Sequence, residues 1–435
     1  MAATPQHREA PREPAVQHDE PAPSSASQRG LDWLNFLIAD VQTGFGPFVA
    51  LYLASEHWSQ GGIGLVLTVG GLVGILSQVP GGALVDWVPM KRMLVGGALA
   101  AIAAGALIFA LFSDPAMIFL AEVLHGSTAG IIEPAMAAIG LGLVGHRALG
   151  KRLGRNQRFD SLGNAATAAA MAGLGQVISK QMNFVVAAAL CLPAAWALTR
   201  IRGSEIDYAR ARSARRREKP REALRPHELC RNRDLLIFIG SLALFQFVDA
   251  SLMPLATGRL GTQHQANSEL LTGALVVVPQ LVTVVIAAWV ARRAEAWGRK
   301  PLLIVSFAVE PIRAAAFALV PSPWFLVGVQ VLDGIDAAVI GILMPLVIAD
   351  VTRGTGRYNL AQGTAGTATG IGASLSTVAS GYAAQFFGYD AAFFGLAAVG
   401  VVAVAVVLFF LRETQPEEHR PEPAIRRSPR FDRPR

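Results

Sequence analysis

Charged residues are scarce in this sequence. Lys, Arg, Asp and Glu together make up 16% of the 435 residues, whereas hydrophobic residues make up 52%. A soluble domain carries about a quarter charged residues. The deficit argues against a soluble protein and indicates that lipid forms part of the chain's surroundings.

Cysteine is also scarce, since Cys191 and Cys230 are the only two. Two thiols are too few for a disulfide framework or a thiolate metal site, and we expect both to be reduced and structural. The sequence also lacks a nucleotide-binding P-loop, a catalytic triad in recognisable spacing and a metal-ligand cluster. We therefore expect no enzyme activity, no cofactor and no bound metal.

Both ends of the chain lack an apolar core. Residues 1–30 are rich in Pro, Ala, Ser, Gln and charge, and they contain no apolar segment typical of a signal peptide. Residues 412–435 have the same character. This composition predicts two disordered tails.

Long apolar runs are what the chain has in abundance. A bilayer core of ~30 Å needs about 20 apolar residues in a helix, so these runs predict membrane-spanning helices. The predicted spans number twelve and are residues 31–54, 61–83, 93–112, 116–142, 160–179, 183–199, 235–256, 270–290, 301–320, 324–349, 359–382 and 391–411. We expect an all-α integral membrane protein.

The basic residues predict the orientation of these spans. With the N-terminus on the cytoplasmic side and each segment crossing once, 35 of the 38 Lys and Arg residues fall in cytoplasmic stretches. Only Lys180 and Arg259 fall on the other side. Cytoplasmic loops carry such an excess of positive charge. The net charge of +7 therefore follows from topology and needs no nucleic-acid partner.

The longest polar interruption, residues 200–234, divides the spans into six and six. We expect an N-terminal half at residues 31–199 and a C-terminal half at residues 235–411, joined by this basic cytoplasmic linker.

The two halves also resemble each other in sequence. EVLHGSTAGII aligns without gaps on QVLDGIDAAVI, which pairs Gly126 with Gly334. A second alignment, of GALVDWVPMK on ARRAEAWGRK, pairs Asp86 with Glu295. The similar offsets indicate one duplicated unit, as in transporters built from internal repeats.

The residues Gly82, Leu84, Asp86 and Lys91 resemble the signature loop between helices 2 and 3 of the major facilitator superfamily, whose pattern is G-x-L-x-D-R-x-G-R-K. The resemblance covers residues 31–411. It implies twelve transmembrane helices in two pseudo-symmetric six-helix halves, which transport a solute by alternating access.

The resemblance also implies a gate, because the loop carboxylate in this family helps to close the cytoplasmic side at a helix N-terminus, where an anion is favoured. The alternative is a simple cluster of charges that sets topology. Asp350, at the cytoplasmic edge of span 324–349, joins this group. The residues expected at the gate are Asp86, Lys91, Arg92, Glu295, Gly298, Arg299, Lys300 and Asp350.

Charged side chains inside the spans are few, and each costs about 2.5–3.5 kcal/mol in a bilayer. Glu310 and Arg313 lie one turn apart, and we expect a local ion pair that neutralises itself. The others fall in the first, fourth, seventh and tenth spans, which line the central cavity in the superfamily. These expected substrate-binding or proton-coupling residues are Asp40, Glu122, His125, Glu133, Asp249, Asp333 and Asp336.

This group of seven contains no Lys or Arg. A site for a phosphate or carboxylate would need a cation to stabilise its ligand. We therefore expect a site for protons or for a cationic or amphiphilic substrate. Because a His there also has a structural use, hydrogen bonding to a neighbouring carboxylate, its coupling role is one of two alternatives.

The leading hypothesis is a proton-coupled transporter that exports a small cationic or amphiphilic compound, as a monomer in a bacterial inner membrane. Uptake of a small neutral solute with protons remains open, because direction depends on the coupling. A membrane sensor or assembly factor that does not transport also remains open, since a fold does not fix a function.

Overall fold

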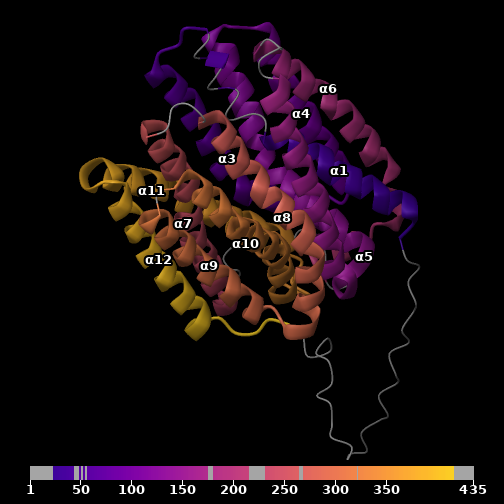
Figure 1. The fold of residues 1–435 in the computed structure, drawn as a ribbon. Coiled ribbons are helices and arrows are strands. Elements are labelled where there is room, and N and C mark those ends of the chain that lie inside the picture. Colours follow the sequence, from indigo (N-terminus) through magenta and orange to yellow (C-terminus); the bar gives the residue numbers. More distant parts are fainter. Residues whose placement is uncertain are drawn as a thin grey trace, which may run out of the picture.

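The computed structural model describes residues 23–415 apart from 44–48, 50–51, 54–55, 175–179, 215–230, 264–267 and 321. Within these ranges the chain is almost entirely α-helical (Figure 1). The helices are α1 (Ser25–Thr43), α3 (Gln60–Trp87), α4 (Lys91–Leu111), α5 (Pro115–Leu174), α6 (Lys180–Arg200), α7 (Arg233–Gln263), α8 (Ser268–Trp297), α9 (Lys300–Leu319), α10 (Pro323–Val351), α11 (Tyr358–Phe387) and α12 (Tyr389–Phe410). Two short 3-10 helices, η1 (Gly203–Glu205) and η2 (Arg210–Arg212), follow α6.

Eight of the described helices are long and apolar enough to cross a membrane. The longest, α5, joins two predicted spans in 60 residues and is broken at Gly145, where φ is 69° and ψ is 173°. Glycine tolerates this left-handed conformation at little cost. Counted as two helices, α5 brings the described α-helices to twelve, in agreement with the predicted number.

The helix after Gly145 begins well before the predicted start at residue 160. Residues 147–158, predicted as a cytoplasmic stretch, are helical. The prediction started late because hydropathy marks only the apolar part of a helix. A helix with a basic end continues past that part.

The helices gather in two groups, α1 and α3–α6 from the first half of the sequence and α7–α12 from the second (Figure 1). In the first group α5 packs against α1, α3 and α4. In the second, α11 packs against α7, α10 against α8, and α12 against α9. The groups meet mainly where α5 contacts α8 and α3 contacts α11.

The paired glycines of the sequence repeat make matching contacts. A β-carbon on Gly126 would lie 2.5 Å from a backbone oxygen of α3, and one on Gly334 would lie 2.5 Å from a backbone oxygen of α8. The Ser77 hydroxyl lies 3.3 Å from the carbonyl oxygen of Gly126, and the Thr283 hydroxyl lies 2.9 Å from that of Gly334. Small residues permit such close helix packing in lipid. The same contact therefore occurs once in each half.

We predict that Gly126→Ala and Gly334→Ala each lower stability by about 1–3 kcal/mol, because the added methyl group forces two helix backbones apart. The measurement is the thermal unfolding midpoint of the purified protein in detergent. Gly240→Ala is the matched control, since a β-carbon at this helical glycine meets no atom within 4 Å. Equal midpoints for all three variants would contradict the role assigned to the glycine contacts.

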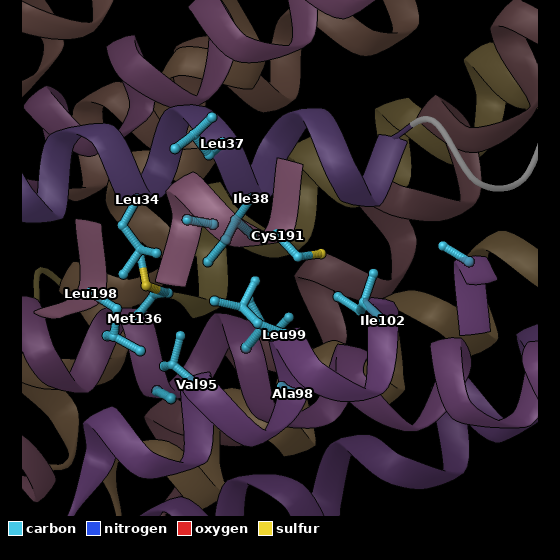
Figure 2. Packing of buried hydrophobic residues seen from close by; sticks show 14 of the residues in the cluster. Leu34, Leu37, Ile38, Val95, Ala98, Leu99, Ile102, Met136, Cys191 and Leu198 are labelled. Atoms are coloured by element: carbon cyan, nitrogen blue, oxygen red, sulfur yellow. The ribbon is translucent and has the colours of Figure 1, made fainter. Parts of the chain in front are cut away.

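Buried apolar side chains hold the first group together (Figure 2). The cluster draws on α1, α4, α5 and α6, and its labelled members are Leu34, Leu37, Ile38, Val95, Ala98, Leu99, Ile102, Met136, Cys191 and Leu198. The thiol of Cys191 is free and buried among them, as expected of a structural cysteine. Cys230 lies outside the described residues.

The first part of the linker is ordered and bonded to both groups. The Asp207 amide donates to the Gly142 carbonyl oxygen at 3.1 Å, and the Gly354 amide donates to the Ser213 carbonyl oxygen at 2.6 Å. The Ser213 hydroxyl also lies 2.7 Å from Nε2 of His146. We call the end of the molecule that carries η1 and η2 the linker face.

The start of α1 is also fixed to the linker. The Ser24 amide donates to Oε2 of Glu205 at 2.9 Å, and this hydrogen bond lowers the pKa of the Glu205 carboxyl. Residues 23–30 therefore have a defined structure, although composition assigned them to a disordered tail. Residues 1–22 lie outside the described residues.

Candidate functional site

A buried carboxylate joins the two groups of helices at the linker face. Asp86, at the end of α3, accepts hydrogen bonds from the Asn359 amide at 3.2 Å, the Asn359 side chain at 2.7 Å and the Leu360 amide at 2.7 Å. The Asn359 side chain also donates to the Ala211 carbonyl oxygen at 3.1 Å. An anion is favoured at a helix N-terminus, and these amides begin α11. We call this set the α3–α11 contact.

The two basic residues after this loop have different surroundings. Lys91 is buried, and its ammonium donates to the carbonyl oxygens of Val85 and, at 2.9 Å, Val88. It thereby satisfies carbonyl groups at the C-terminal end of α3. Arg92 lies beside Gly203 of η1.

The second copy of the loop has a network of its own. Arg299 donates to Asp350 at 3.0 Å and to the Ala294 carbonyl oxygen at 2.6 Å. The backbone amides of Arg299 and Lys300 donate to Glu413 at 2.9 and 3.0 Å. The glycine before them, Gly298, has a φ of 92°, and a β-carbon there would collide with Glu413. Glu413 could not be anticipated, because it follows the last apolar run and falls in the predicted tail at 412–435.

Two further residues of this copy can be placed. The ammonium of Lys300 donates to the Leu408 carbonyl oxygen at 2.8 Å. Glu295 extends from α8 to Gly150, near the start of the second part of α5. The repeat partners Asp86 and Glu295 therefore both reach the opposite group of helices, but only Asp86 is buried.

A cavity of about 310 Å³ lies between the two groups. It is lined by α1, α3 and α5 from one group and by α10 and α11 from the other. Its polar lining consists of Asn35, Gln78, Glu133, Asn156, Gln157, Asp160 and Gln362. Among the described lining residues there is no Lys or Arg.

Two carboxylates face this cavity. Glu133 was predicted from its place in an apolar span. Asp160 was missed, because it stands at the edge of a predicted span next to a basic stretch. Its only sequence signal was an acid among basic residues at a helix start. The Asn164 side chain donates to Asp160 at 3.3 Å.

An ion-paired group supports the cavity wall. Arg152 donates to Asn156, which lines the cavity, at 2.7 Å and to Asp32 at 2.5 Å. Arg155 also binds Asp32, through two nitrogens. The buried pair between α1 and α5 therefore fixes the Asn156 side chain. Asp32 escaped the sequence analysis because it lies at the very start of the first apolar span.

A second cluster of charge lies within the second group of helices. The Arg313 guanidinium contacts Glu310 at 2.7 Å, Asp249 at 3.1 Å, Asp333 at 2.5 Å and Asp336 at 3.1 Å. We call these five residues the Arg313 cluster. Arg313, Glu310 and Asp336 are buried, whereas Asp249 and Asp333 are partly exposed.

The Arg313 cluster corrects two expectations. The ion pair of Glu310 with Arg313 exists but is not local, since three more carboxylates share the same guanidinium. The expectation that the acidic residues lie without a cation was wrong for Asp249, Asp333 and Asp336. Helix axes pack about 8–10 Å apart, so a long Arg side chain on α9 reaches acids on α7 and α10. One-turn spacing along a helix cannot reveal such contacts.

The remaining predicted residues lie elsewhere. Glu122 is buried against Gly70 of α3, and neither it nor His125 lines the described cavity. Asp40 belongs to α1, but its side chain lies outside the described residues. The structure thus divides the predicted acids other than Asp40 between the cavity, the Arg313 cluster and the α3–α5 interface.

Comparison with known proteins agrees with this architecture. A family model described as Major Facilitator Superfamily matches residues 32–309 and 262–433. An uncharacterized MFS-type transporter of Mycobacterium tuberculosis is 38% identical over 389 residues, covering 89% of this chain and 93% of the relative. The class B tetracycline resistance protein of Escherichia coli is 29% identical over 143 residues, 33% of this chain and 35% of that protein.

The fold matches solved structures as well. The proton:xylose symporter XylE superposes with a TM-score of 0.69 at 14% identity, covering 90% of this chain and 97% of XylE. The family model and the relative at 38% identity therefore lead to one conclusion, with which the fold agrees: the chain belongs to the major facilitator superfamily of secondary membrane transporters.

Proposed function

We propose that this protein is a proton-coupled transporter that exports a small cationic compound by alternating access. The observation that carries the proposal is the cavity between the halves, which Glu133 and Asp160 line without any described Lys or Arg. Two carboxylates, with no basic residue in the described lining, favour a cationic ligand and disfavour an anionic one. The likeness to a tetracycline resistance protein over a third of the chain is consistent with export.

The Arg313 cluster supports proton coupling. Four carboxylates share one guanidinium, so full ionisation would leave three uncompensated negative charges in a largely buried site. Buried like charges disfavour one another, and protonation relieves the repulsion. We propose that protons bind here, entering through the partly exposed Asp249 and Asp333.

The contacts between the halves support alternating access. Hydrogen bonds join α3 and α11 at two levels. The Thr367 hydroxyl donates to the Ile75 carbonyl oxygen at 3.3 Å. At the linker face, Asp86 accepts from the amides that begin α11. We propose that the α3–α11 contact is the gate and that it is closed in this conformation. Arg299 with Asp350 stabilises the matching loop of the other half.

The topology proposed with this function follows the charge distribution. The halves at residues 31–199 and 235–411 move relative to each other as a monomer in a bacterial inner membrane. The linker face and both termini lie on the cytoplasmic side, where the excess of Lys and Arg belongs.

The test is transport by the purified protein in liposomes with an imposed pH gradient, with internal pH followed by a dye. Organic cations, neutral sugars and carboxylates are added in turn. We expect cations to elicit proton flux, and we expect Glu133→Gln and Asp160→Asn to reduce it at least tenfold. Glu56→Gln, a change at an exposed acid outside the cavity, should leave the flux unchanged.

Other outcomes would contradict the proposal in distinct ways. Flux elicited by carboxylates would show that the cavity charge does not select the substrate. Flux with neutral sugars alone would support uptake with protons. Absence of flux with every compound, from folded protein, would favour the sensor or assembly role.

A further inference from the structure

Three of the seven polar side chains that line the cavity make no hydrogen bond within the described residues. Glu133, Gln78 and Gln157 line the cavity, and no hydrogen bond within the described residues engages their side chains. A carboxylate offers only acceptors, and each primary amide offers two donors and an acceptor. Because these groups face the cavity, they are available to a ligand that carries both donors and acceptors.

The other cavity amides keep part of their capacity free. Asn35 donates to the Leu31 carbonyl oxygen, and Gln362 donates to the Tyr358 hydroxyl. These bonds use the amide nitrogens and leave the two side-chain oxygens available as acceptors. Asn156 has the opposite arrangement, because Arg152 occupies its oxygen and its nitrogen remains a donor.

The apolar part of the lining is aliphatic. Its described members are Ile, Leu, Met, Ala, Pro and Gly residues of α5 and α10, together with Ile38 of α1. None of the described lining residues is Phe, Tyr or Trp. Flat aromatic cations and quaternary ammonium groups are typically held against aromatic rings. The described lining of the cavity offers them no such surface.

The size of the cavity limits the ligand further. Its volume of about 310 Å³ lies at the lower end of the range for ligand sites. A compact molecule whose polar groups point in several directions matches both the volume and the amides on several walls.

Resting on the transport function proposed above, we propose that the substrate is a small aliphatic primary amine with several hydroxyl groups, of the amino sugar or amino alcohol class. The ammonium group, with three donors, pairs with Glu133 and Asp160. The hydroxyl groups exchange hydrogen bonds with Gln78, Gln157 and the remaining amides.

The experiment is equilibrium binding to the purified protein in detergent, with probes that separate these features. Glucosamine carries amine and hydroxyls, glucose carries hydroxyls alone, cyclohexylamine carries the amine alone, and tetraphenylphosphonium is an aromatic cation. We expect glucosamine to bind at least tenfold more tightly than each of the others. Gln78→Leu and Gln157→Leu should each weaken glucosamine binding about tenfold while leaving cyclohexylamine binding unchanged.

A further variant separates the roles of charge and hydroxyl groups. Glu133→Gln should remove most of the preference for glucosamine over glucose. Tighter binding of tetraphenylphosphonium, equal binding of glucose, or no binding of glucosamine to folded protein would each overturn the substrate class. Because binding is measured without a gradient, it is independent of proton flux. Glucosamine binding without flux would refute the coupled export and leave the assignment of the cavity in place.

Discussion

Replacing Arg313 by methionine is expected to abolish proton-coupled transport and to lower stability by about 3–5 kcal/mol, the range for breaking a buried ion pair. The guanidinium is the sole described cation that contacts Glu310, Asp249, Asp333 and Asp336. Without it these acids lose their counter-charge and the hydrogen bonds that hold them together. The measurements are thermal unfolding in detergent and proton flux in liposomes.

A second variant separates stability from coupling. Combining Arg313→Met with Glu310→Gln and Asp336→Asn removes the uncompensated buried acids, so stability should largely return while coupled flux stays absent.

Arg202→Met is the matched control, because its pair with Glu205 lies 3.6 Å apart at the exposed linker face. Exposed pairs contribute about 0–1 kcal/mol. Normal coupled flux in the triple variant would remove the Arg313 cluster from the proposed mechanism.

Asp86→Ala is expected to shift the protein toward a conformation open at the linker face, with at least a tenfold rise in the accessibility of the cavity from that side. The substitution removes the acceptor for three hydrogen bonds from Asn359 and Leu360. It also removes the charge that favours the N-terminus of α11. The two halves therefore lose the hydrogen bonds that hold α3 against α11 in this conformation.

The rise can be measured by maleimide labelling of a cysteine placed at Met344, which lines the cavity. The background carries alanine at Cys191 and Cys230, and the reagent is added from the linker side of oriented vesicles. Asp114→Asn is the control. Asp114 accepts hydrogen bonds from backbone amides at the start of α5, and both of these bonds lie within the first group of helices. Equal labelling of Asp86→Ala and the control would mean that the α3–α11 contact is not the gate.

The fold was predictable from sequence because lipid imposes a strong constraint on composition. Twelve apolar runs suffice to give the helix number, and the resemblance of the loop at Gly82, Leu84, Asp86 and Lys91 indicates the family. Helix ends were less predictable. The second part of α5 already includes residues 147–158, but these are rich in basic residues, so hydropathy does not mark them as helical. The alignment of Gly126 with Gly334 predicts that the two glycines make similar contacts. It does not predict which helix each glycine contacts.

The site was only partly predictable for a related reason. A scarce charge in an apolar run is conspicuous, and this signal found Glu133 and the acids of the Arg313 cluster. Asp160 and Asp32 stand at the edges of such runs, where charge is ordinary. The partners of Arg313 depend on how three helices pack, which one-dimensional spacing does not encode.

The side chain of Asn359 is shared between two pieces of the chain, since it donates both to Asp86 and to the Ala211 carbonyl oxygen of the linker. Separation of α3 from α11 therefore disturbs the covalent strap between the halves at the same moment. Because one side chain makes both hydrogen bonds, we expect the release of Asp86 and the release of the Ala211 carbonyl oxygen to occur together. Under the proposed mechanism, the described start of the linker would therefore take part in the timing of the transport cycle.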